Sequence, residues 1–126
     1  MVDSVVHVEV VGPDGPGLQR FYAGLFGWEY ETGSVVAPAV ADAGDYGFVT
    51  PAPDAGPVAG GVGTGIGSSH YAIFYVGVDD VGEALAAAER LGGTRTMGPE
   101  AKPDGSLVVG HFRDPAGNLV GVAGPR

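Results

Sequence analysis

The stretch HFRDPAGNLVGVAG, residues 111–124, decides the fold. Its Asp-Pro-Ala-Gly-Asn segment (114–118) combines residues that favour a tight turn, with apolar residues on both sides. It therefore predicts two strands, Leu107–Arg113 and Asn118–Ala123, joined by that turn. Immediately before them, strand Thr94–Met97 is predicted to follow a helix over Val81–Leu91, which Asp80 would cap and Gly92 would end.

The same order of elements is predicted twice along the chain. The first half carries a strand at Val5–Val11, a helix at Gly17–Phe26, and strands at 28–32, 46–50 and 57–62, and the second half begins with a strand at 70–76. The Gly-rich run Gly60–Gly67 has neither a following GK[ST] nor a helix, so it indicates a flexible linker rather than a phosphate loop. A chain of 126 residues can form one domain built from half-modules 1–62 and 68–126.

Composition excludes several classes of function. Six Lys+Arg face fifteen Asp+Glu, for a formal charge of -9, which disfavours nucleic-acid binding. There is no cysteine for a disulfide or thiolate site, and no apolar run long enough to cross a membrane. A cytoplasmic location is the default expectation. The acidity either keeps the protein in solution or attracts a cationic ligand.

Four segments together resemble one known family. VHVEV (6–10), FYAGLFGWEY (21–30), VGVDDVGEALAAAERLGG (76–93) and FRDPAGNLVGV (112–122) are similar to the vicinal oxygen chelate superfamily, which includes glyoxalase I, extradiol dioxygenases, fosfomycin-resistance thiol transferases and bleomycin-resistance proteins. The resemblance implies an α+β fold, in which two βαβββ half-modules form a curved mixed sheet around an open cleft, with the helices on the outer face. It also implies a homodimer.

Metal-dependent members of this superfamily carry His, Glu or Gln donors on the first, fourth, fifth and eighth strands. Here only His7, on the first strand, matches that pattern; the fifth-strand position is Ile73 and the eighth-strand position is Gly121. His70 could supply the fifth-strand donor only through a bulge or shifted alignment. No Asp, Glu, His, Gln or Asn lies between Pro57 and Gly67. Because these donors are missing, we expect no metal cofactor.

An alternative keeps a metal. His7 and Glu9 share one face of their strand, and His111 could complete a two-His, one-carboxylate set for a divalent ion such as Ni, Zn, Mn or Fe. Without metal, Glu9 and a nearby histidine could act as general acid and base, or they could be a hydrogen-bonded polar pair.

Two functions remain open. The first is a binding protein of the bleomycin-resistance kind, holding an aromatic or cationic drug or metabolite. The second is a glyoxalase-like enzyme (lyase, isomerase/epimerase or dioxygenase) in which Glu9 and His111 are catalytic, or which uses a rebuilt metal site. Strand aromatics would stack on a flat ligand, and loops 33–45 and 98–106 would shape its pocket. The predicted ligand-binding residues are His7, Glu9, Trp28, Tyr30, Phe48, Ile73, Tyr75, His111 and Gly121.

Overall fold

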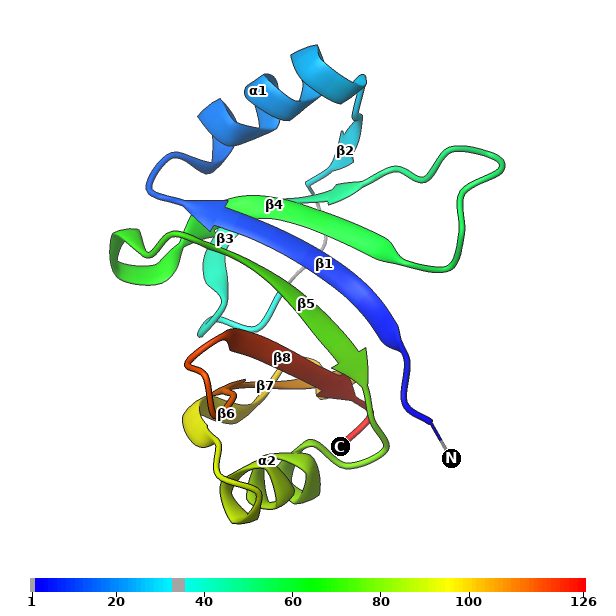
Figure 1. Ribbon diagram of the computed structural model, residues 1–126. Coiled ribbons are helices and arrows are strands. Elements are labelled where there is room, and N and C mark those ends of the chain that lie inside the picture. The colour runs from blue at the N-terminus through cyan, green and yellow to red at the C-terminus, as the bar shows by residue number, and fades with distance from the viewer. Residues whose placement is uncertain (1, 33–35) are drawn as a thin grey trace. The chain divides into compact units, whose positions relative to one another are not determined.

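The computed structural model describes residues 2–32 and 36–126. It divides the chain into two compact units, one formed by His7–Ala72 and the other by the residues up to Val6 together with Ile73–Arg126. We call the first the Glu9 unit and the second the His111 unit. Along the chain, a strand, a helix and three more strands occur twice, which confirms the predicted order and the α+β class (Figure 1).

In the Glu9 unit the strand order is β2-β3-β4-β1. Strand β1 (Val5–Gly12) runs parallel to β4 (Ala59–Gly65), with Glu9 opposite Gly61, while β3 (Ala41–Val49) runs antiparallel to β4 and to the short β2 (Tyr30–Glu31). Helix α1 (Gly15–Phe26) packs over β3 and β4 (Figure 1). The Asp14 side chain caps its first turn, and Gly27 ends it in the left-handed region at φ 71°.

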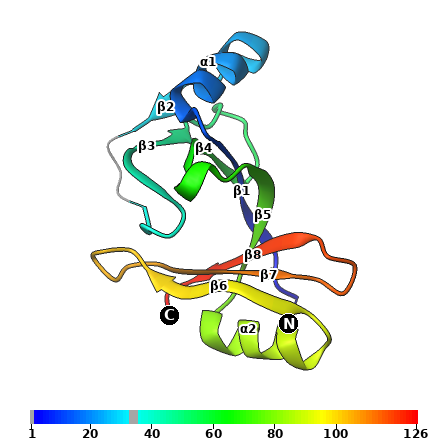
Figure 2. The same ribbon diagram turned by 90° about the vertical axis from the view of Figure 1, so that its left-hand side faces the viewer.

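In the His111 unit the strand order is β5-β8-β7-β6. Strand β5 (Tyr71–Gly77) runs parallel to β8 (Leu119–Gly124), and β7 (Val108–Arg113) pairs antiparallel with both β8 and β6 (Thr94–Ala101). Helix α2 (Val81–Arg90) covers one face of β6, β7 and β8 (Figure 2). The predicted cap is confirmed, because the Asp80 side chain accepts a hydrogen bond from the Glu83 amide at 3.1 Å. Val81 and Leu85 of this helix pack with Val122 of β8 to form the core of the unit.

The predicted Gly-rich linker is wrong over most of its length. Residues up to Gly65 belong to β4, and a short 3-10 helix follows at Ile66–Ser68. Strand pairing uses backbone groups that glycine supplies as well as any residue, so composition alone misassigned the segment. Strand β3 also begins earlier than predicted, at Ala41, within the supposed loop 33–45, of which residues 33–35 lie outside the described residues. Strand β6 likewise extends to Ala101, into the supposed loop 98–106.

Two remaining points concern membrane-spanning helices and the predicted single domain. Within the described residues, neither helix is long and apolar enough to cross a membrane. The single domain with one open cleft remains a prediction.

Candidate functional site

The Glu9 unit buries a carboxylate among phenols. Glu9, on β1, is only 3% exposed. The Tyr46 hydroxyl donates a hydrogen bond to its Oε1 at 2.8 Å, and the Tyr71 hydroxyl donates to its Oε2 at 2.9 Å. An ionised carboxylate accepts hydrogen bonds and donates none, so two donors on its two oxygens match the charged form. The phenols replace water around a charge that burial would otherwise strongly disfavour.

Tyr46 also bonds to His7, two residues before Glu9 on the same strand face. The His7 Nε2 lies 2.8 Å from the Tyr46 oxygen. Because the single hydroxyl proton of Tyr46 goes to Glu9, His7 must donate from Nε2 to the phenol oxygen. The Phe48 ring lies 6.0 Å from the His7 ring, between centroids, so aromatic groups surround this polar chain.

The surroundings shift the pKa values of two side chains in this cluster, Tyr46 and His7. Burial, followed by the charge and hydrogen bond of Glu9, raises the pKa of Tyr46 far above its ordinary value of 10.0. Burial lowers the pKa of His7 below its ordinary value of 6.5. Tyr46 therefore keeps its hydroxyl proton at physiological pH and remains a hydrogen-bond donor, and His7 favours its neutral form.

The His111 unit holds a second, uncharged pair. His111, on β7, is 6% exposed, and its Nε2 lies 2.7 Å from the hydroxyl of buried Tyr75 on β5. Burial lowers the pKa of His111 from 6.5 to about 4, so the imidazole is neutral at pH 7. A neutral buried histidine can accept a proton or hold a ligand by a hydrogen bond.

A glycine lies against each of these tyrosines. A Cβ added to Gly61 on β4 would overlap the phenol of Tyr46, and one added to Gly121 on β8 would overlap the ring of Tyr75. The absence of a side chain at Gly61 is therefore required for Tyr46 to reach His7 and Glu9. The tyrosine rings fill the room that a side chain on β4 or β8 would need.

The residues present do not fit the metal centre that the resemblance implies. The donor positions on the fifth and eighth strands are buried Ile73 and Gly121, the fourth strand has no donor, and the Nε2 of His7 is bonded to Tyr46. Among the described residues, no three His, Cys, Asp or Glu side chains are placed to hold a metal ion. The alternative set of His7, Glu9 and His111 gains no support.

The predicted ligand-binding residues fall into three groups. His7, Glu9 and Phe48 lie together in the Glu9 unit, and Tyr75, His111 and Gly121 lie together in the His111 unit, which also contains Ile73. The joint use of Glu9 and His111 stays a prediction, because they belong to different units.

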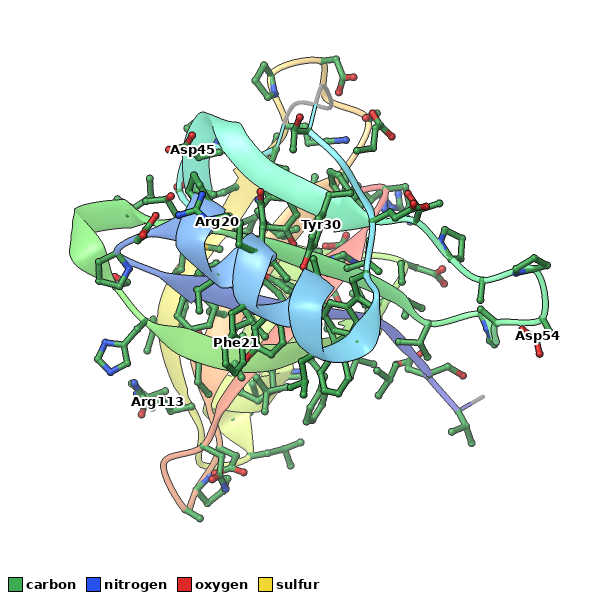
Figure 3. The ribbon with its side chains drawn as sticks, turned by 90° about the horizontal axis from the view of Figure 1, so that it is seen from above. Arg20, Phe21, Tyr30, Asp45, Asp54 and Arg113 are labelled. Carbon is green, nitrogen blue, oxygen red and sulfur yellow. The ribbon has the colours of Figure 1, made fainter. Side chains whose placement is uncertain are left out.

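The third group lies beside helix α1, apart from the Glu9 cluster. The Trp28 ring packs on Tyr22 and Phe26, with centroids 5.5 and 5.3 Å away, and lines a groove of about 630 Å³ beside the loop that carries Asp54 (Figure 3). The Tyr30 hydroxyl donates to the Gln19 carbonyl of the helix at 3.0 Å. These two aromatics support the helix, and a role for them in ligand binding remains a prediction.

Sequence reasoning missed Tyr46 and Gly61. Tyr46 could have been found, because it lies two residues before Phe48 and so shares its strand face. The pairing of Gly61 with Glu9 depends on a parallel register that no local pattern indicates.

Comparisons with known proteins agree with this fold. The sequence model of the Glyoxalase/Bleomycin resistance protein/Dioxygenase superfamily matches residues 4–122. No curated protein sequence matches the chain significantly. A variant of Streptomyces coelicolor methylmalonyl-CoA epimerase, solved in complex with 2-nitronate-propionyl-CoA, aligns with a TM-score of 0.67 and 13% identity, covering 98% of this chain and 95% of that one.

A superfamily member from Vibrio splendidus 12B01 aligns with a TM-score of 0.59 and 16% identity, covering 98% of this chain and 99% of that one. At these identities the structural likeness shows the fold alone. Together with the match over residues 4–122, it establishes that the chain belongs to the glyoxalase/bleomycin resistance protein/dioxygenase superfamily.

Proposed function

We propose that this protein binds a small molecule without a metal ion, as a glyoxalase/bleomycin-resistance type protein with a degenerate metal site. One observation carries the proposal: both oxygens of Glu9 accept phenol hydrogen bonds, and His7 donates to one of those phenols. A carboxylate held in this way is a fixed negative charge, and is poorly suited to be a free general base.

The ligand we propose is an aromatic or cationic drug or metabolite. Aromatic rings beside a buried negative charge favour an organic cation, which gains from both the charge and the ring faces. The rings of His7, Tyr46 and Phe48 lie within 6.4 Å of one another between centroids, next to Glu9. The formal charge of -9 would raise the local concentration of such a cation.

Calorimetry against a panel of aromatic ammonium compounds and matched neutral analogues tests this proposal. We expect saturable binding of the cations, weakened roughly tenfold or more by Glu9→Gln, because one buried charge contact is worth more than about 1.4 kcal/mol. Asp54→Asn is the matched control, since it removes the same charge from an exposed loop. Equal weakening by both variants would show that only the overall charge acts, and would contradict a site at Glu9.

A second function is favoured by one observation, the neutral buried imidazole of His111. A neutral imidazole and a carboxylate could exchange a proton with a substrate carbon, as an isomerase or epimerase requires. Among the similar structures, one is described as methylmalonyl-CoA epimerase in complex with methylmalonyl-CoA and NH4+. Incubating the protein with acyl-CoA thioesters in D2O tests this function. Deuterium uptake at the carbon next to the thioester, lost in both Glu9→Gln and His111→Gln, would favour the enzyme over the binder.

We also propose that the protein is a homodimer that pairs through helix α1. The helix exposes Phe21, Leu25 and Phe26 by 60%, 59% and 57% of their surfaces (Phe21 is labelled in Figure 3). Clustered exposed apolar groups of this size mark association surfaces, and on a chain of charge -9 an uncharged face is where two copies repel least. Light scattering should show a dimer that Leu25→Glu converts to monomer. Arg20→Glu, which adds a carboxylate to the same helix, should leave the dimer intact.

A further inference from the structure

We infer that two tyrosines, Tyr46 and Tyr75, exclude metal ions from this chain. Each places its ring over a strand glycine and its hydroxyl on the Nε2 of a histidine. The inference rests on the proposed metal-free function and names the residues responsible for it. Metal-binding side chains are not only absent at Gly61 and Gly121, because the tyrosine rings also fill the space that such side chains would need.

The first part of the inference is steric. Any side chain on Gly61 would meet the Tyr46 phenol, and any side chain on Gly121 would meet the Tyr75 ring. Both tyrosines are buried, so neither ring can move into solvent without opening a cavity in a packed interior. A donor restored at either glycine would therefore have no room while the tyrosine remains.

The second part concerns the histidine nitrogens. A metal ion needs an imidazole lone pair, and at His7 the Nε2 carries the proton that it donates to Tyr46. A metal at this nitrogen would have to displace the Tyr46 hydroxyl and leave Glu9 Oε1 without that donor. Tyr46 thus commits both surviving polar groups of β1 to a hydrogen-bonded chain.

The two tyrosines reach these positions from different strands. Gly61 pairs with Glu9 on β1, and Gly121 pairs with Tyr75 on β5, so Glu9 and Tyr75 occupy equivalent places in the two units. The tyrosine over Gly61 comes instead from β3. The same arrangement has therefore arisen from non-equivalent positions, which a simple remnant of an internal repeat would not produce.

The register shows how a metal site could be reopened within the Glu9 unit. Gly61 lies directly opposite Glu9, and His7 shares the face of Glu9 two residues away. Neighbouring strands are about 4.8 Å apart, so a histidine in place of Gly61 would join His7 and Glu9 as a third donor once the Tyr46 ring is removed. Gly61→His without removal of the ring should create no site.

The test measures zinc retained after incubation and desalting, by plasma mass spectrometry, in four proteins: the wild type, Gly61→His, Tyr46→Ala, and the double variant Tyr46→Ala/Gly61→His. We expect the double variant to retain close to one zinc per chain. The wild type and Gly61→His should retain roughly tenfold less or lower, the scale on which a metal site's supporting residues change affinity. Circular dichroism and a cooperative thermal transition establish that each variant is folded.

The outcomes separate this inference from the proposed function. Stoichiometric zinc in the wild type would contradict both. A folded double variant that retains no more zinc than the wild type would overturn the inference alone. Should the double variant not fold, Tyr46→Phe keeps the ring but removes the hydroxyl that bonds the His7 Nε2. Zinc should then perturb the imidazole NMR signals of His7 at roughly tenfold lower concentration than in the wild type, and equal concentrations in both proteins would overturn the inference.

Discussion

The two units share a strand order and a tyrosine over a glycine, but they differ in charge. In the Glu9 unit the tyrosine hydroxyl lies between a histidine and an ionised carboxylate, whereas in the His111 unit it faces a neutral histidine. The place of Glu9 on β1 is taken by Tyr75 itself on β5. In this fold, a tyrosine hydroxyl bonds the buried polar side chain in both units, whether that side chain is a carboxylate or a neutral imidazole.

Replacing either glycine by a larger residue should cause the largest loss of stability, because it should displace the tyrosine ring that covers that glycine. Gly121→Leu and Gly61→Leu each force a side chain into a buried ring, so each should lower the free energy of unfolding by about 3 kcal/mol. Urea denaturation measures this loss. Gly24→Ala is the control, because nothing lies within 4 Å of its added Cβ in the helix, and it should stabilise by about 0.5–1 kcal/mol. A tolerated Gly121→Leu would show that the Tyr75 ring moves freely.

The pH dependence of stability should be stronger for His111 than for His7. The folded pKa of His111 is lowered to about 4 from 6.5, so the unfolded chain binds more protons between those values. The neutral form of His111 contributes fully to stability above pH 6.5. This contribution is lost as the pH falls toward 4, and the total loss is roughly 3 kcal/mol. The pKa of His7 is lowered too, so its contribution has the same sign.

Denaturation at pH 7 and pH 4.5 checks this prediction in the wild type, His111→Gln and His7→Gln. The difference in stability between the two pH values should shrink most in His111→Gln. An unchanged difference in that variant would place the acid sensitivity elsewhere.

Removing one tyrosine hydroxyl should lower the free energy of unfolding by a smaller amount, and by more in the Glu9 unit than in the His111 unit. Tyr46→Phe takes a donor from a buried carboxylate and should lower stability by about 1.5–3 kcal/mol, whereas Tyr75→Phe affects a neutral histidine and should cost about 1 kcal/mol. Urea denaturation at pH 7 compares the two variants directly. Equal losses would mean that Glu9 is not held as a charged group by Tyr46.

Much of this fold could be predicted from local patterns. Alternation of apolar residues marked β1, helical spacing and Asp80 marked α2, and the Asp-Pro-Ala-Gly-Asn turn marked the β7–β8 hairpin. Each of these signals is a pattern among residues that are close together in the sequence. The predicted strand at 57–62 covers only part of β4 (Ala59–Gly65), because the many glycines of this strand leave few side chains to show alternation or strand propensity.

The site was predicted less completely, for a similar reason. Glu9 was identified because it shares a strand face with His7, and His111 was identified as a possible third member of that set; both side chains are buried. Their partners Tyr46 and Tyr75 come from other strands, and only the register brings them within hydrogen-bond distance. Trp28 lies before β2 rather than on the predicted strand, and its ring packs against helix residues Tyr22 and Phe26; its role in ligand binding stays a prediction.

The most direct test of the account is an imidazole nitrogen NMR spectrum of the wild-type protein, recorded with and without one equivalent of zinc. The chain has three histidines, and exposed His70 serves as the internal reference. We expect His7 to carry its proton on Nε2, His111 to be neutral at pH 7, and zinc to leave both signals unchanged. A His7 that lacks the Nε2 proton, or whose signals shift on adding zinc, would contradict this expectation.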